Sequence, residues 1–192
     1  MIDKQLFIER FPLGSLSESA TDTVIRIIDY FYEDDGFEVL AELAYILATA
    51  YHESAHTFNP GIREIGHGGG KVYGRTDPNT GQRYYGRGLC QLTWKANYQK
   101  FSEILGVDLV AGPDLALEKE NSVKILMIGM RAGHFTGKKL RMFINAEQTD
   151  FLGARKVVNG TDKALLISKH AITLYDYLMQ AKIPEQNEHK IL

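Results

Sequence analysis

Half of the chain's glycines lie in one short segment, and this limits what that segment can form. Of 18 glycines in 192 residues, nine stand between residues 61 and 88. Glycine inside a helix or strand costs about 0.5–1 kcal/mol relative to alanine, so no long regular element is expected here. Turn residues at 77–81 and the flanking residues 72–73 and 83–85 predict at most a small β-hairpin. A long irregular segment inside a compact domain is usually functional.

Apolar residues recur at helical spacing on both sides of this segment. We expect one helix from Ser17 or Ser19 to about residue 33 and a central, tightly packed one from 37 to about 56. Further helices are expected at 93–105, 117–131 and about 162–181, with a short one between Asp150 and residues 159–160. The predicted fold class is mainly α. One domain should span 1–192, with the glycine-rich insertion at about 61–88 and a loose tail at about 184–192.

Composition and charge exclude several classes of protein. Hydrophobic residues make up 44% of the chain, enough for a real core, and the net charge is −2. A nucleic-acid-binding protein would show a strong basic excess. A single cysteine, Cys90, allows no intrachain disulfide. No apolar run is long enough to cross a bilayer, and residues 1–6 lack the pattern of a secretory signal. We therefore expect a soluble protein made in the cytoplasm.

The pentapeptide His52-Glu53-Ser54-Ala55-His56 is compatible with a zinc protease. On a helix it would put two imidazoles one turn apart beside a glutamate. A third ligand is also needed, and the extended motif would have Gly and His where the chain has Asn59 and Ile62. His67 and His134 could supply that ligand only if folding brought them near. We therefore expect no metal and no other cofactor, and keep the zinc protease as a less favoured alternative.

Glu53 can instead serve as the acid of a glycosidase. Glycoside cleavage commonly uses two carboxyl groups, about 6.5–9.5 Å apart when the reaction inverts the anomeric centre. Glu53 should lie near the C-terminal end of an apolar helix, where burial and the helix dipole favour the neutral acid. Glu64, which follows Arg63 in the glycine-rich segment, is the best second carboxylate, since Arg63 could help hold it ionised. Asp77 is a weaker candidate.

Residues 84–98 indicate a saccharide groove. Gly86 and Gly88 let the backbone approach a polymer closely. Aromatic rings can stack on sugar faces, while amides and hydroxyls can bind sugar hydroxyl and acetamide groups. A tight turn with buried aromatics would explain some of these residues, but not the density of polar groups. The candidates are Tyr84, Tyr85, Gln91, Thr93, Trp94, Asn97 and Tyr98.

Tyr84-Tyr85-Gly86-Arg87-Gly88, running into Gln91-Leu92-Thr93-Trp94 and Asn97-Tyr98, resembles the signature of glycoside hydrolase family 19 chitinases and related phage and bacterial endolysins. His52-Glu53-Ser54 is similar to the segment around that family's general acid. Further similar stretches are Gly106-Val107-Asp108-Leu109, Gly112-Pro113-Asp114-Leu115 and Val157-Val158-Asn159-Gly160. In order and spacing, these motifs cover residues from about 40 to 175.

The resemblance implies a lysozyme-like fold of two lobes, with a substrate cleft between them, and hydrolysis with inversion. It gives the general-acid role to Glu53 and supports Glu64 as the second acid, since in short endolysin-like members this acid follows soon after the first. It also implies substrate contacts by Gln91, Thr93, Asn97 and Asn159, with Tyr98 nearby. Only Cys90 is present, so the disulfides of plant chitinases are absent. This favours the microbial or phage branch.

We therefore expect a single catalytic domain that cleaves β-1,4 bonds of peptidoglycan as an endolysin does. Chitin is the nearest alternative substrate, because both polymers present N-acetylglucosamine. A saccharide-binding protein with an inactive site is a rival from another class. The expected partner is a peptidoglycan- or chitin-type polysaccharide, with no nucleic acid and no membrane insertion. The protein should act on the cell wall as a monomer, after release through a holin-type partner.

Overall fold

The computed structural model describes residues 1–184, and this part of the chain is mainly helical, as predicted. Residues 1–184 contain isolated β-bridges but no β-strand. The α-helices are α1 (Lys4–Glu9), α2 (Glu18–Glu33), α3 (Leu40–Glu53), α4 (Lys95–Leu105), α5 (Lys119–Ala132) and α6 (Ala164–Gln180). The short 3-10 helices are η1 (Ile65–Gly68), η2 (Val72–Gly74), η3 (Pro113–Leu117), η4 (Leu140–Met142) and η5 (Gly153–Val157).

Helix α3 is the centre of the fold. Every residue from Ala41 to Ala50 is buried, and α3 packs most extensively against α6. A helix that is apolar on all sides has to be surrounded by other elements, so the predicted central position is confirmed. The one carboxylate in this buried run, Glu42, accepts hydrogen bonds from the backbone N–H groups of Glu38 (2.7 Å) and Val39 (3.0 Å). It thereby satisfies donors at the start of the helix.

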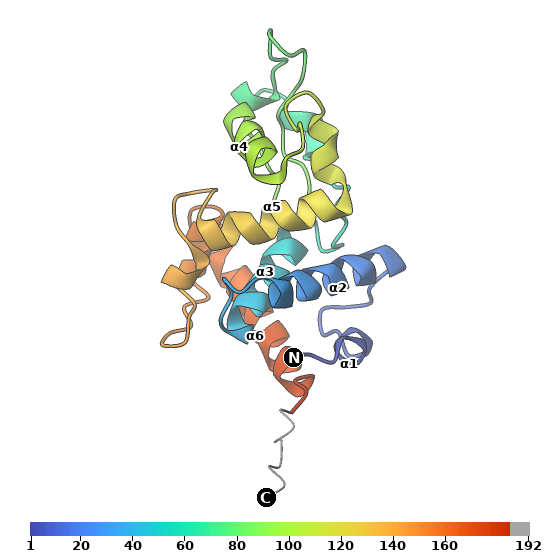
Figure 1. Ribbon diagram of the computed structural model, residues 1–192, viewed down its shortest axis with the longest axis vertical. Coiled ribbons are helices and arrows are strands. Elements are labelled where there is room, and N and C mark those ends of the chain that lie inside the picture. The colour runs from blue at the N-terminus through green and yellow to red at the C-terminus, as the bar shows by residue number, and fades with distance from the viewer. Residues whose placement is uncertain (185–192) are drawn as a thin grey trace, which may run out of the picture.

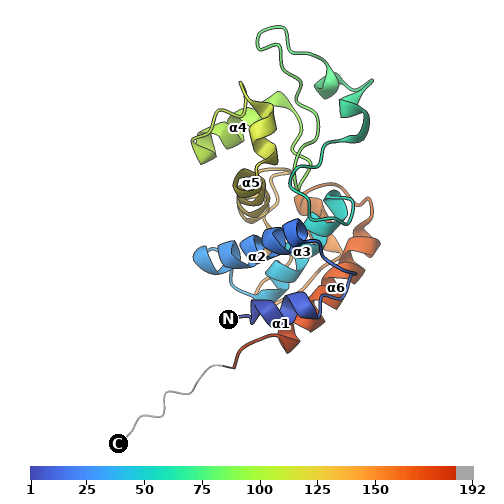
Figure 2. The ribbon, with the colours of Figure 1, turned by 90° about the vertical axis from the view of Figure 1, so that its right-hand side faces the viewer.

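The molecule has two lobes, and α5 crosses between them (Figures 1 and 2). Helices α1, α2, α3 and α6 form the lower lobe of Figure 1, while α4 and the irregular chain between α3 and α4 form the upper one. The two ends of the described chain meet in the lower lobe, where Ile183 N–H donates to the carbonyl of Met1 (3.0 Å). This arrangement is the lysozyme-like, two-lobed fold that the resemblance implied.

The structure corrects the predicted end of the central helix. Helix α3 stops at Glu53 instead of about residue 56, because Ala55, His56 and Phe58 all have positive φ angles (51°, 68° and 51°). The buried hydroxyl oxygen of Ser54 accepts a hydrogen bond from the Phe58 N–H (2.8 Å) and fixes this turn. Glu53 is consequently the last helical residue, and His56 lies beyond the helix.

Other local predictions also need correction. The expected hairpin at 72–73 and 83–85 does not form strands: residues 72–74 make η2, and only Asp77–Gln82 and Tyr84–Tyr73 backbone bonds join the two arms. The helix expected between Asp150 and Gly160 is reduced to η5. Helix α1, capped by Asp3, was not predicted. The expected loose tail lies almost entirely outside the described residues.

No helix within residues 1–184 has the length and apolar character required to span a bilayer.

Candidate active site

Glu53 lies at the end of the central helix and forms an ion pair with Arg155. The guanidinium Nη1 of Arg155 is 2.7 Å from the Glu53 carboxylate. The Arg155 side chain is 3% exposed, and its Nε also donates to the carbonyl of Asp162 (2.9 Å). The sequence analysis missed Arg155, although it stands two residues before the motif 157–160. The sequence analysis expected surroundings that favour the neutral acid, whereas the structure places a fixed cation against the Glu53 carboxylate.

Glu64 is held as a double acceptor in the glycine-rich segment. One carboxylate oxygen accepts a hydrogen bond from the Tyr73 hydroxyl (2.7 Å) and the other from the Gly86 N–H (3.0 Å). The hydrogen bond that Tyr73 donates to Glu64 raises the pKa of Tyr73, so the phenol remains a donor. Each carboxylate oxygen keeps a second lone pair, so Glu64 can still accept a hydrogen bond from a water molecule or take up a proton.

The expected pairing of Arg63 with Glu64 was wrong, and Asp77 is now a weaker candidate for the second carboxylate. Arg63 does not pair with Glu64; its guanidinium binds Asp114 (3.0 Å). Asp77, the weaker candidate for second carboxylate, accepts from the N–H groups of Asn79 and Thr80 and pairs with Lys95 (3.0 Å). The Lys95 ammonium is the main cause that lowers the pKa of Asp77. Asp77 therefore shapes a turn.

A polar pocket of about 210 Å³ lies between the groove segment of the upper lobe and the chain after α5 and η5. Four of the predicted substrate-binding residues line it: Gln91, Thr93, Trp94 and Asn97. The amide nitrogen of Gln91 donates to the Gly88 carbonyl (3.1 Å) and that of Asn97 to the Thr93 carbonyl (2.9 Å). Their amide oxygens therefore remain acceptors, suited to the hydroxyl and acetamide N–H donors of a sugar.

Neither candidate carboxylate lines this pocket directly, but each is linked to it through a neighbouring residue. Cys90 lines it, and the Glu53 carboxylate is close enough to raise the pKa of the Cys90 thiol further, after burial itself. On the other side, Gly86 brings Glu64 and Gln91 together. A Cβ on Gly86 would lie 2.7 Å from the Gln91 Oε1 and 3.3 Å from the Glu64 Cβ. Glycine is therefore required where these two side chains converge.

The groove segment has strained backbone at two of its candidate residues. Gln91 has φ 53° and Trp94 has φ 71°. Such angles cost a residue other than glycine about 1–3 kcal/mol and cluster at functional sites. The turn is held by a hydrogen bond from the Trp94 N–H to the Tyr84 carbonyl (2.9 Å). As a result the Trp94 ring is 49% exposed and available for stacking.

Tyr85 and Tyr98 support the groove from behind. Tyr98 is fully buried; its hydroxyl donates to the Tyr85 carbonyl (2.8 Å) and accepts from Arg87 (3.0 Å). The Tyr85 ring is 7% exposed, between His67, which stacks on it, and Arg87, whose guanidinium carbon is 3.7 Å from the ring centre. We therefore revise their predicted role from substrate contact to support of the groove.

Asn159 lies at the edge of the site. Its neighbour Val158 lines the polar pocket, but the side-chain oxygen of Asn159 accepts from the Gly160 N–H (2.8 Å). Asn159 is exposed, so its remaining amide group faces solvent next to the pocket.

The histidines do not assemble the predicted alternative zinc site. His56 has left helix α3, and its ring centre is 6.3 Å from that of His52. His67 stacks on Tyr85, and His134 packs against Phe101 near the end of α5. No group of three potential ligands suited to a metal occurs in residues 1–184. His52 and His56 instead neighbour His170 of α6.

Comparison with known proteins agrees with this geometry. The family model described as chitinase class I matches residues 63–126, which include Glu64 and the groove segment. Endochitinase 1 of Theobroma cacao is 47% identical over 47 residues, or 22% of this chain and 15% of that protein. Inactive chitinase-like protein 1 of Hevea brasiliensis is 51% identical over 35 residues, which are 18% and 11% of the two chains. The matches thus span only a small part of these relatives.

Solved structures extend the likeness over nearly the whole chain. Chitinase C from Streptomyces griseus HUT6037 superposes with a TM-score of 0.58 at 19% identity, covering 94% of this chain and 76% of that one. A bacterial family 19 chitinase superposes with a TM-score of 0.54 at 16% identity, covering 92% and 94%. This chain is thus similar to family 19 chitinases in fold along almost its whole length and in sequence over residues 63–126.

Proposed function

We propose that the protein is a glycoside hydrolase that cleaves β-1,4 bonds of peptidoglycan with inversion. The observation that supports the proposal is that two carboxylates each neighbour a residue at the edge of one polar pocket. Glu53 adjoins it through Cys90, and Glu64 adjoins it across Gly86. A pair of carboxyl groups beside a groove of sugar-binding side chains is the arrangement that glycoside hydrolysis requires.

In this proposal Glu53 donates a proton to the leaving glycosidic oxygen. Glu64 accepts a proton from the water that attacks the anomeric carbon from the opposite face. Arg155 fixes the orientation of the Glu53 carboxylate, and the Tyr73 hydroxyl and Gly86 N–H fix that of Glu64. Because both carboxylates are held by neighbouring side chains or backbone, their orientation is partly organised before substrate binds.

Peptidoglycan is proposed as the substrate because the chain resembles the short endolysin-like members and has a single cysteine, unlike disulfide-bonded plant chitinases. Chitin is the alternative, favoured by the names of the relatives and of the solved structures. The endolysin resemblance also supports action on the cell wall, as a monomer, after release through a holin-type partner.

A saccharide-binding protein without turnover is a second candidate. It is favoured by the match to a relative named an inactive chitinase-like protein. Similarity in that segment is thus compatible with loss of activity, and an experiment must separate binding from cleavage.

The test is digestion of purified peptidoglycan and of chitin hexamer, followed by assays for new reducing ends and for new amino groups. The proposal expects reducing ends from peptidoglycan and no new amino groups. Reducing ends from the chitin hexamer alone would favour a chitinase, and new amino groups without reducing ends would favour peptide cleavage. Binding to either polymer without any product would identify the inactive binding protein.

A further inference from the structure

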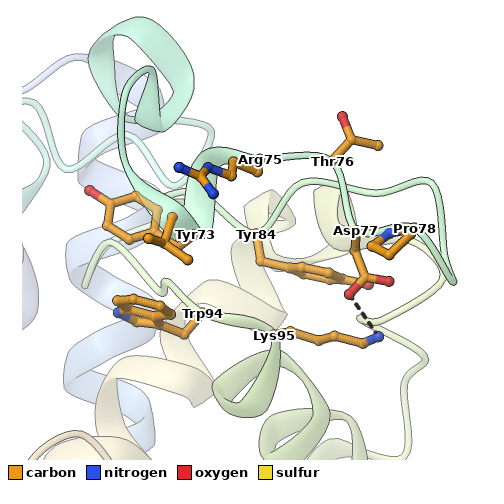
Figure 3. A pocket seen from close by; sticks show the side chains of 9 residues that line it. Tyr73, Arg75, Thr76, Asp77, Pro78, Tyr84, Trp94 and Lys95 are labelled. Atoms are coloured by element: carbon orange, nitrogen blue, oxygen red, sulfur yellow. Dashed lines mark hydrogen bonds and ion pairs between the residues drawn. The ribbon is translucent and has the colours of Figure 1, made fainter.

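A second pocket lies in the upper lobe, next to the candidate active site. It has a volume of about 300 Å³ and is lined by Val72, Tyr73, Arg75, Thr76, Asp77, Pro78, Tyr84, Trp94 and Lys95 (Figure 3). Two contacts make it continuous with the site already described. Trp94 lines both pockets, and Tyr73, which forms a wall of the second pocket, donates the hydrogen bond to Glu64. A polymer bound at Glu64 would therefore lie next to a residue that lines this pocket.

The walls of this pocket suit a sugar ring. Tyr73 and Trp94 meet edge to face, with ring centres 5.2 Å apart, so together they present an angled aromatic surface. Aromatic side chains combine apolar faces with polar edges, as a pyranose ring also does. Trp94 is half exposed, so its ring is open to a ligand.

The opposite wall of the pocket is fixed by polar contacts. Asp77 binds Lys95 (3.0 Å) and caps the turn through the N–H of Thr80 (3.0 Å). The Thr80 hydroxyl is hydrogen-bonded to the Tyr84 hydroxyl (2.8 Å). Arg83 donates to the carbonyl of Gly74 (2.6 Å). A wall that is already ordered lowers the entropic cost of binding a ligand.

One charged side chain that lines this pocket, Arg75, has no partner within residues 1–184. Of the five Lys or Arg residues at 61–88, Arg63 and Arg87 pair with Asp114, and Arg83 donates to carbonyls. Lys71 and Arg75 have no ion pair or side-chain hydrogen bond within residues 1–184. Only Arg75 of these two lines the pocket. Figure 3 shows its guanidinium on the side of Tyr73 and Trp94, while Lys95 extends to Asp77 on the other side.

We propose that this pocket is a second saccharide subsite in which Arg75 binds a carboxylate of a muramyl unit. The inference rests on the proposed function and narrows its substrate. Peptidoglycan carries carboxylates on its stem peptides and on those lactyl groups that bear no peptide, whereas chitin is uncharged. An unpaired guanidinium beside an aromatic sugar platform distinguishes these polymers, since the arginine fork matches a carboxylate in geometry as well as in charge.

The test is equilibrium binding in a Glu53→Gln background, which prevents turnover. The ligands are a GlcNAc–MurNAc tetrasaccharide with stem peptides, the same tetrasaccharide without them, and chitotetraose. Arg75→Gln should raise the Kd for muramyl ligands about three- to fivefold, the effect of an exposed ion pair, and leave chitotetraose binding unchanged. Lys71→Gln, which removes a neighbouring cation outside the pocket, is the matched control and should have a smaller effect.

Weaker binding of the peptide-free ligand alone would place the carboxylate on the lactyl group, because attachment of the stem peptide converts that carboxyl group to an amide. Weaker binding of both muramyl ligands would show that Arg75 accepts a carboxylate in either position. Weaker binding of the peptide-bearing ligand alone would place it on the stem peptide. No change with any ligand, an equal change with all three, an equal effect of Lys71→Gln, or no binding at all would overturn the proposal. If Arg75→Gln weakens muramyl binding but the wild type releases no reducing ends, the proposed hydrolase activity is wrong and the proposed subsite remains supported. If the wild type cleaves peptidoglycan but Arg75→Gln does not change binding, the proposed subsite is wrong and the proposed hydrolase activity remains supported.

Discussion

Two side chains that were not identified from the sequence hold the candidate carboxylates in place. Arg155 fixes Glu53, and Tyr73 fixes Glu64. Arg155 lines neither of the two pockets, and the Tyr73 hydroxyl is bonded to Glu64 while its ring lines the second pocket, so the Arg155 guanidinium and the Tyr73 hydroxyl should act on catalysis by positioning. Their effects should therefore appear mainly in kcat, because KM reports uniform binding of the substrate in the groove.

Arg155→Lys keeps the positive charge but loses the fork that binds Glu53 and the Asp162 carbonyl together. Misplacement of a catalytic group by about 1 Å can cost about 100-fold in rate, so we expect kcat to fall by about that factor with little change in KM. Steady-state kinetics on solubilised peptidoglycan measures both. A higher KM at unchanged kcat would show that Arg155 binds substrate instead.

Tyr73→Phe removes one of the two hydrogen bonds to Glu64 and keeps the aromatic ring. Loss of a hydrogen bond to a charged group, worth about 1.5–3 kcal/mol, should lower kcat by roughly ten- to a hundredfold. Tyr177→Phe on α6, whose hydroxyl has no hydrogen bond within residues 1–184, is the control. If both variants keep wild-type kcat, Glu64 does not depend on Tyr73.

At the scale of elements, the groove depends on a buried network beneath it. Arg87 is 4% exposed; it pairs with Asp114 (2.7 Å) and donates to the carbonyls of Arg83 and Tyr85 and to the Tyr98 hydroxyl. The signature residues Arg87 and Tyr98 thus hold the turn in which Gln91 and Trp94 adopt strained angles. Arg87 and Tyr98 should therefore contribute to function by maintaining the shape of this turn.

Tyr98→Phe should lower the free energy of unfolding by about 1–2 kcal/mol, because the Tyr85 carbonyl loses a buried donor. KM should stay near the wild-type value, since the ring and hydroxyl are buried beneath the groove. Urea unfolding and steady-state kinetics test the two parts separately. A large rise in KM with unchanged stability would restore the sequence-based role of Tyr98 as a substrate contact.

The sequence predicted which helices form better than it predicted where they end and which side chains meet. The spacing of apolar residues predicts α2, α4, α5 and α6 closely, because that spacing reflects which helix face is buried. The early end of α3 depends on three positive φ angles after Ser54, and the sequence gives no measure of them. Arg155 was missed because it lies 102 residues from Glu53, and such pairings arise only from tertiary packing. Glu64 and the pocket residues Gln91, Thr93, Trp94 and Asn97 were identified because the signature is local.

At the scale of the whole molecule, α3 and α6 meet at a cluster formed by His52, His56 and His170. Burial lowers the pKa values of His52 and His170 below the ordinary 6.5, and neighbouring histidines contribute. Charges facing His52 partly compensate each other, since Glu53 and Asp162 raise its pKa and Arg155 lowers it. These surroundings therefore favour the neutral rings of His52 and His170.

A histidine with a lowered pKa binds more protons in the unfolded chain, so stability falls as the pH falls. The contribution should be complete above about pH 6.5 and should be lost as the pH drops through the lower folded values. We expect His170→Gln to reduce the change in unfolding free energy between about pH 7 and pH 5. His67→Gln, outside the cluster, is the control. Equal pH dependence in wild type and His170→Gln would contradict this.

The most direct test of the central claim is the rate at which Glu53→Gln releases reducing ends from peptidoglycan. The substitution keeps the size of the side chain and removes its acid. General acid catalysis contributes about 100- to 10,000-fold, so the rate should fall by about 1,000-fold while the variant still binds the polymer. Glu103→Gln, an exposed change on α4, should keep the wild-type rate. A Glu53→Gln rate within about tenfold of wild type would show that Glu53 is not the acid.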